Sequence, residues 1–181
     1  MKTMLKIFAL LVAVSTVTHA QVSTIAFSQR MDTYTPIVGT VLAGSTGYAD
    51  DEAYPVNLPF AFKFNNQFYT TVYPCTNGYI TLGAADPYLY SYPISYSSSY
   101  GATGVLCPWG WDLHGNSSGE MSYLISGSAP YRVCTIQWKN WHYYYASADA
   151  LNFQVRIYET TGLIEFLYGN CTNAGTSRLV N

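Results

Sequence analysis

The apolar residues of this chain recur at every second position, which is the period of a half-buried β-strand. The stretch LPFAFKFNNQF (residues 58–68) places Phe60, Phe62 and Phe64 on one face, and its Asn65-Asn66 pair predicts a turn. No window of about a dozen residues shows the 3.6-residue period of an amphipathic helix. The pattern therefore predicts antiparallel strands rather than helices.

Three further stretches continue this pattern. CTNGYITLG (75–83) has a turn signal at Asn77-Gly78, and GEMSYLISGSAPYRVCTIQWKN (119–140) predicts two strands joined at residues 126–130. LNFQVRIYETTGLIEFLYGN (151–170) predicts a hairpin with its turn at Thr161-Gly162. Its predicted core positions are Leu151, Phe153, Val155, Ile157, Ile164, Phe166 and Tyr168, and its predicted wet face carries Asn152, Gln154 and Arg156.

Many short strands without intervening helices predict an all-β fold, an antiparallel β-sandwich of jelly-roll or Ig-like outline. Residues 21–181 are long enough for a single domain with its own core. The segment 91–104 is rich in Ser, Tyr and Gly and is predicted as a surface loop. The last residues contain no closing strand, which is compatible with a chain that is the N-terminal part of a longer protein.

Residues 1–20 have the pattern of a cleaved export signal. Lys2 and Lys6 precede an apolar run at residues 7–14, and Thr18 and Ala20 supply the small residues that a signal peptidase needs. We expect cleavage near Ala20 and a secreted or surface-exposed mature chain. No other apolar segment approaches the roughly 20 residues that span a bilayer, so no membrane span is expected.

Four cysteines lie after this leader, at Cys75, Cys107, Cys134 and Cys171. An even count in an exported chain predicts two disulfides, with three possible connectivities. Cys107–Cys134 is slightly favoured, because both segments are predicted as strands of one sheet. The spacing contains no CxxC pair and therefore does not indicate a zinc site.

The charge of the mature chain limits its partners. Six Lys and Arg residues remain against ten Asp and Glu, a net charge of −4 without a basic cluster. Nucleic-acid binding needs a basic patch and is not expected. No cofactor and no metal site is predicted.

The aromatic run WKNWHYYY (138–145) is the main candidate for a binding site. If the alternation continues from Arg132 without a bulge, Trp138 faces the core, and Trp141, Tyr143 and Tyr145 follow one another on the polar face about 7 Å apart. Exposed rings suit carbohydrate, and Asn140 would add hydrogen bonds. The alternative is a hairpin loop whose rings fold over the edge of the sandwich.

Two other clusters have ordinary structural interpretations. In CPWGWDLHG (107–115), Asp112 and His114 are too few for a metal site, and an Asp at a strand end more often caps a turn. Asp50, Asp51 and Glu52 lack the spacing of an EF-hand and are interpreted as a solvated loop. Asn116 and Asn170 fit glycosylation sequons, which matter only in a eukaryotic host.

Catalysis has little support in the sequence. A glycoside hydrolase needs two carboxylates across a cleft, and Glu159 and Glu165 belong to no recognisable catalytic motif. There is no G-x-S-x-G, and His114 and His142 have no evident Ser or Cys partner.

Four stretches carry a family resemblance: LPFAFKFNNQFYTTVYPCTNGYITLG, VLCPWGWDL, GSAPYRVCTIQWKNW and LNFQVRIYETTGLIEFLYGN. In this order they resemble β-sandwich modules of large secreted bacterial surface proteins, many of them type IX secretion cargo. The last hairpin also resembles nidogen-type extracellular domains. The resemblance covers roughly residues 54–169. The four cysteines and the lack of a C-terminal sorting domain depart from that pattern.

The resemblance implies an extracellular, non-catalytic module. It also implies that Asn77-Gly78, residues 109–112, Trp138 and residues 153–154 define the fold. We therefore expect an adhesion or surface-recognition module that binds a glycan or matrix polymer. The alternatives are a scaffolding domain of a larger protein and, less favoured, a polysaccharide hydrolase. The oligomeric state stays open.

Overall fold

The computed structural model describes residues 26–89 and 101–172 of the chain, and within them it contains ten β-strands and no helix. The predicted leader and most of the predicted loop at 91–104 lie outside these residues. The strands are β1 (Thr40–Gly44), β2 (Val56–Phe64), β3 (Gln67–Cys75), β4 (Tyr79–Leu82), β5 (Gly104–Leu106), β6 (Leu113–His114), β7 (Glu120–Ser126), β8 (Val133–Tyr143), β9 (Ala146–Tyr158) and β10 (Ile164–Tyr168).

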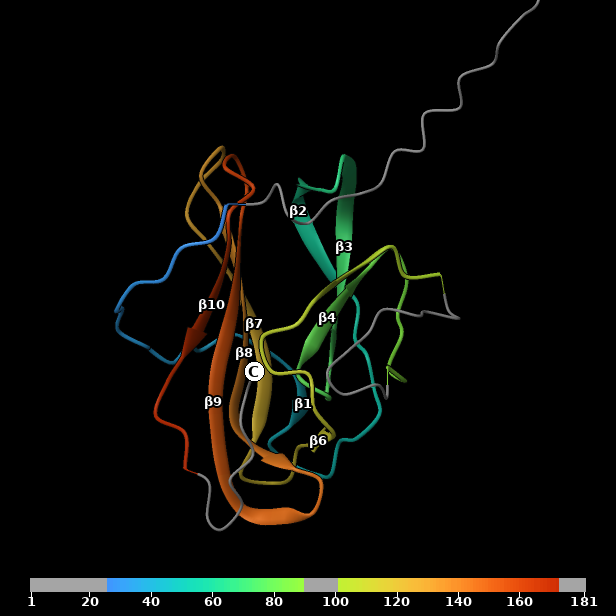
Figure 1. Cartoon of the computed structure of the whole chain (residues 1–181), viewed down its shortest axis with the longest axis vertical. Coiled ribbons are helices and arrows are strands. Elements are labelled where there is room, and N and C mark those ends of the chain that lie inside the picture. The colour runs from blue at the N-terminus through green and yellow to red at the C-terminus, as the bar shows by residue number, and fades with distance from the viewer. Residues whose placement is uncertain (1–25, 90–100, 173–181) are drawn as a thin grey trace, which may run out of the picture.

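The strands form two antiparallel sheets that lie face to face (Figure 1). The larger sheet has the order β1-β7-β8-β9-β10, with the short β6 paired to β8, and the smaller sheet has the order β2-β3-β4-β5. One core cluster joins Phe62 and Ile80 of the smaller sheet to Ile136, Trp138 and Phe153 of the larger one. The fold is therefore an all-β sandwich, as the alternation of the sequence predicts.

Local chemistry explains where the chain turns. Asn65 and Asn66 join β2 to β3 with positive φ values of 46° and 61°, a conformation that Asn tolerates better than most residues. Gly78, with φ 76°, lies in the turn between β3 and β4. Gly162, with φ 63°, lies in the turn between β9 and β10, as predicted.

The polar face of the larger sheet differs from the prediction. Gln154 was predicted on the wet face, and Thr135 and Gln137 alternate with the core residues Cys134, Ile136 and Trp138, yet all three polar residues are buried. Residues 26–39, here called the strap, run along this sheet next to β10 (Figure 1). Gln137 and Gln154 use their side-chain amides to bond the strap backbone at Ile37 and Thr35. A polar face can thus be buried when another segment satisfies its hydrogen bonds.

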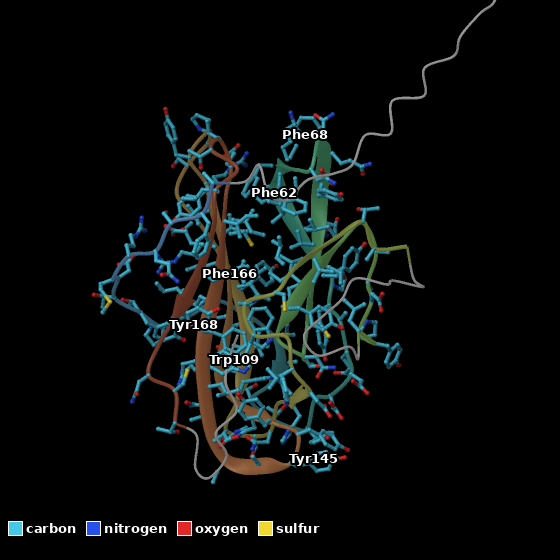
Figure 2. All side chains as sticks on the ribbon, in the orientation of Figure 1. Phe62, Phe68, Trp109, Tyr145, Phe166 and Tyr168 are labelled. Carbon is cyan, nitrogen blue, oxygen red and sulfur yellow. The ribbon has the colours of Figure 1, made fainter. Side chains whose placement is uncertain are left out.

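The return strand of the last hairpin is less buried than predicted. Phe166 and Tyr168 lie opposite Val155 and Phe153, which are core residues, but both rings are exposed. β10 is the edge strand of the larger sheet, so its inner face is only partly covered. Figure 2 shows Phe166 and Tyr168 along this strand, with Trp109 near Tyr168. The ring centroids of Trp109 and Tyr168 are 5.9 Å apart.

The structure does not support the predicted disulfides, because Cys75, Cys107, Cys134 and Cys171 are all free thiols. The Cys107–Cys134 pair was favoured because both segments were predicted as strands of one sheet. Instead, Cys107 follows β5 of the smaller sheet, and Cys134 is in β8 of the larger one. Burial raises the pKa of the Cys75 and Cys134 thiols to about 12, so neither is a ready nucleophile.

Candidate functional site

The aromatic run changes phase at a bulge around Asn140. Between the pairs Trp138–Phe153 and Trp141–Leu151, β8 advances by three residues while β9 advances by two. The extra residue is accommodated near Asn140, which has a positive φ of 49°. The bulge returns Trp141 and then Tyr143 to the core face that Trp138 already occupies.

The predicted row of exposed rings is therefore wrong for two of its three members. Trp141 is 0% exposed and Tyr143 is 2% exposed. The Trp141 indole N–H donates to the carbonyl of Thr76 at 2.7 Å, and the Tyr143 hydroxyl accepts from the Trp109 indole at 3.2 Å. These rings join the two sheets, and neither presents a face to a ligand.

Asn140, the fourth predicted binding residue, also makes hydrogen bonds within the fold. Its backbone N–H donates to Asn152 Oδ1 at 3.0 Å, and its side-chain amide lies 3.4 Å from the carbonyl of Ser118. Its amide thus ties the bulge to the neighbouring chain segments.

The third predicted ring is exposed. Tyr145 is 81% exposed and Tyr144 is 38% exposed, and their rings meet edge-on at 4.6 Å in the turn between β8 and β9. Figure 2 shows Tyr145 at this end of the molecule and Phe68 at the opposite end. The exposed rings of this turn are thus Tyr144 and Tyr145, of which the predicted row contained only Tyr145.

A residue distant in sequence extends this surface. Tyr48, 63% exposed, lies after β1, and its ring is 5.3 Å from that of His114. His114 in turn meets Tyr144 edge-on at 5.9 Å. We call Tyr48, Tyr144, Tyr145 and the histidines beneath them the tyrosine end. Tyr48 was missed because nothing in the sequence relates the segment after β1 to the β8–β9 turn.

A pair of buried histidines supports the tyrosine end. His114 of β6 and His142 of β8 are directly paired across the strands, with ring centroids 5.7 Å apart. Burial lowers the pKa of His114, against an opposing effect of Asp50, and burial together with His114 lowers the pKa of His142. The Nδ1 atoms of both rings have no hydrogen-bond partner among the described residues. Both imidazoles are thus held neutral near pH 7.

The predicted acidic loop is partly in water, with Glu52 exposed and Asp50 and Asp51 half-buried, and it also fixes the β3–β4 turn. Asp51 accepts from the Asn77 side-chain amide at 2.9 Å, and Asn77 Oδ1 accepts the backbone N–H of Leu113 at 2.9 Å. Asp50 accepts from the Tyr48 hydroxyl at 3.0 Å. Asp50 also acts electrostatically on His114, whose pKa it raises against the larger opposite effect of burial.

The two glutamates considered for hydrolysis are held in ion pairs. Glu159 is bonded by both Arg132 Nε and Nη2, at 2.8 and 2.6 Å, and Arg132 lowers its pKa. A general acid needs the opposite shift. Glu165 binds Arg30 of the strap and the Tyr158 hydroxyl, both at 2.5 Å.

Residues 26–89 and 101–172 contain neither a metal-binding group of side chains nor a membrane-spanning helix. Within them no group of three or more His, Cys, Asp or Glu is arranged to hold a metal ion. None of the secondary structure described there is a helix that is long and apolar enough to cross a membrane.

The fold and this site define an all-β sandwich module with an aromatic surface at one end. A family model described as NIDO related matches residues 24–180, and the chain belongs to this family. No curated protein and no solved structure matches the chain. The nidogen-type resemblance of the final hairpin is thus confirmed at the level of the family.

Proposed function

We propose that this chain is an exported, non-catalytic recognition module of a surface or adhesive protein, and that it binds glycans or matrix polymers at the tyrosine end. The observation that carries the proposal is the convergence of three exposed tyrosines from two separate segments on a rigid base. The export-signal pattern of residues 1–20 supports a role outside the cell.

The chemistry of the tyrosine end suits a sugar polymer. A flat ring packs on sugar C–H groups, and each hydroxyl both donates and accepts hydrogen bonds. Tyr144 is braced by His114 on one side and Tyr145 on the other. A braced ring loses little conformational entropy when it binds, which favours affinity.

A scaffolding role is the second candidate, and a different surface favours it. Large apolar side chains are exposed on the strap and at β10, namely Phe27, Met31, Val38, Leu163 and Phe166. Exposed apolar residues gathered in one region often mark contacts with other domains. In that case the tyrosine end would bind no soluble polymer.

A binding panel of glycans and matrix polymers tests the proposal on residues 21–181. We expect Tyr145→Ala to weaken binding by about 1–3 kcal/mol, roughly 5- to 150-fold, as for a hot-spot ring. Tyr131→Ala is the matched control, because Tyr131 is 74% exposed and lies in the β7–β8 connection at the other end of β8. Equal affinities of the two variants would contradict the proposal. A reducing-sugar assay on the same polymers tests the hydrolase alternative.

A further inference from the structure

Ser122 and Gln137 form an unusual buried pair on the strap side of the larger sheet. They are directly opposite each other in β7 and β8, and both are 0% exposed. Gln137 Nε2 lies 3.4 Å from Ser122 Oγ. A hydroxyl and a primary carboxamide are thus held against each other where water is excluded.

The hydroxyl has a base within hydrogen-bond distance. Ser122 Oγ donates to Glu120 Oε1 at 2.8 Å. Glu120 is two residues earlier in β7 and therefore shares the same face of the strand. A serine becomes a nucleophile when an adjacent base accepts its proton.

The carboxamide oxygen is surrounded by donors. Gln137 Oε1 accepts from the Tyr34 hydroxyl at 3.1 Å, from the Ile37 backbone N–H at 3.0 Å and from Gln154 Nε2 at 3.0 Å. A neutral carbonyl oxygen has two lone pairs, so three donors exceed its ordinary need. Several fixed donors on one oxygen are the arrangement that stabilises the oxyanion of a tetrahedral intermediate.

From this geometry we infer that Ser122 and Gln137 form an intramolecular ester cross-link between β7 and β8. Glu120 takes the proton of Ser122, and Oγ attacks Cδ of Gln137 to give a tetrahedral intermediate whose charge is on Oε1. The Cδ–Nε2 bond then breaks, and Nε2 leaves with the proton from Glu120. The products are one ester and one ammonia, with no oxidant, metal or cofactor.

The surroundings favour retention of the bond once it forms. Both side chains are fully buried, and the strap bonds Gln137 directly, so water has little access to hydrolyse the ester, and ammonia is lost to solvent. β7 and β8 are interior strands of the larger sheet. A covalent link between them would strengthen a module whose four cysteines are free thiols.

Intact-mass spectrometry of the denatured protein tests the inference. We expect the wild type to lose one ammonia more than Ser122→Ala does, and as much as Ser126→Ala, which changes an exposed serine at the end of the same strand. Cyclisation of an N-terminal Gln21, or of Asn77 onto Gly78, would also release ammonia, but it would do so equally in all three proteins. Tandem mass spectrometry should then recover the β7 and β8 peptides joined.

A second variant covers the case in which Ser122→Ala does not fold. Glu120→Gln keeps the hydroxyl and removes only the proton acceptor, so it should fold and accumulate the lighter species far more slowly. Mild alkali should open the ester of the denatured wild type, leaving Glu in place of Gln137. The same loss of ammonia in the wild type and in a folded Ser122→Ala protein, the same rate of loss in Glu120→Gln, or no joined peptide would overturn the inference.

Discussion

At the scale of single residues, the buried ring of Trp141 leaves no room for a side chain at Gly115, the residue after His114. A Cβ atom added at Gly115 would lie 2.2 Å from a ring atom of Trp141, whereas one added at Gly47 would meet nothing within 4 Å. The buried ring cannot move aside easily because its N–H is bonded to Thr76. This contact explains why position 115 is a glycine. Its φ is not positive, so the backbone conformation does not itself require one.

Gly115→Ala should therefore destabilise the fold by about 1–3 kcal/mol, the usual cost of overpacking a core. Gly47→Ala should change the free energy of unfolding by less than about 0.5 kcal/mol, as at an ordinary surface site. Urea unfolding of the two variants measures both values. A tolerated alanine at position 115 would show that Trp141 has room to shift.

The histidine pair predicts a loss of stability in acid. The pKa values of His114 and His142 are lowered from 6.5 by burial, so the unfolded chain binds more protons than the folded one once the pH falls below that value. The stabilisation is complete above about pH 6.5 and decreases as the pH falls through the window beneath it. Tyr48, Asp50 and Asp149 lie around the histidine pair. The carboxylates of Asp50 and Asp149 favour the charged imidazoles, so they reduce the loss of stability in acid without removing it.

His142→Asn tests this effect, since it removes one titrating ring and leaves a neutral side chain. The difference in unfolding free energy between pH 8 and pH 5 should be smaller in the variant than in the wild type. Carboxylates elsewhere contribute equally to both proteins and cancel in the comparison. An identical pH dependence would mean that the pair does not titrate in this window.

At the scale of elements, the β2–β3 turn is held by two asparagines with positive φ. Asn66 is exposed, so a change there acts through the backbone alone. Asn66→Val should cost about 1–2 kcal/mol, because a β-branched residue is strained in the left-handed region. Asn66→Gly should be neutral or stabilising. Thermal unfolding compares the pair, and equal midpoints would contradict the assigned turn.

Strands and turns could largely be predicted from alternation and turn chemistry, because both are local. Phe60 and Phe62 in β2 lie on the predicted core face, and so do the alternate apolar residues of β9, namely Leu151, Phe153, Val155 and Ile157. The prediction of which β8 side chains face the core was wrong beyond Trp138. The bulge at Asn140 shifts the alternation by one residue and moves Trp141 into the core. Asn is enriched at positive φ, so its place between Lys139 and Trp141 was the available signal.

Contacts between distant segments could not be predicted in this way. The strap buries Gln137 and Gln154, and Tyr48 joins Tyr144, through tertiary packing that leaves no mark in local periodicity. The predicted disulfides failed for a related reason, since an even cysteine count does not report which thiols meet in space. Residue types thus indicated which side chains were candidates for a site, but only tertiary packing determines which of them are in contact.

At the scale of the whole molecule, the two ends of this NIDO-related sandwich differ in chemistry. The end with the β8–β9 turn presents tyrosines over buried histidines. The other end presents Phe68 beside Lys63, whose ammonium lies 5.7 Å from the ring centre. Among the described residues, the first end gathers the exposed rings of Tyr48, Tyr144 and Tyr145 over a buried histidine pair, which is why the proposed recognition surface is placed there.

The most direct test is a hydrogen-exchange footprint of the protein with the tightest polymer of the binding panel. We expect slower exchange in residues 143–146 and around Tyr48, with the backbone near Phe68 and the strap unchanged. Protection confined to the strap and β10 would instead support a scaffolding contact. That result, or a panel in which no polymer binds, would contradict recognition at the tyrosine end.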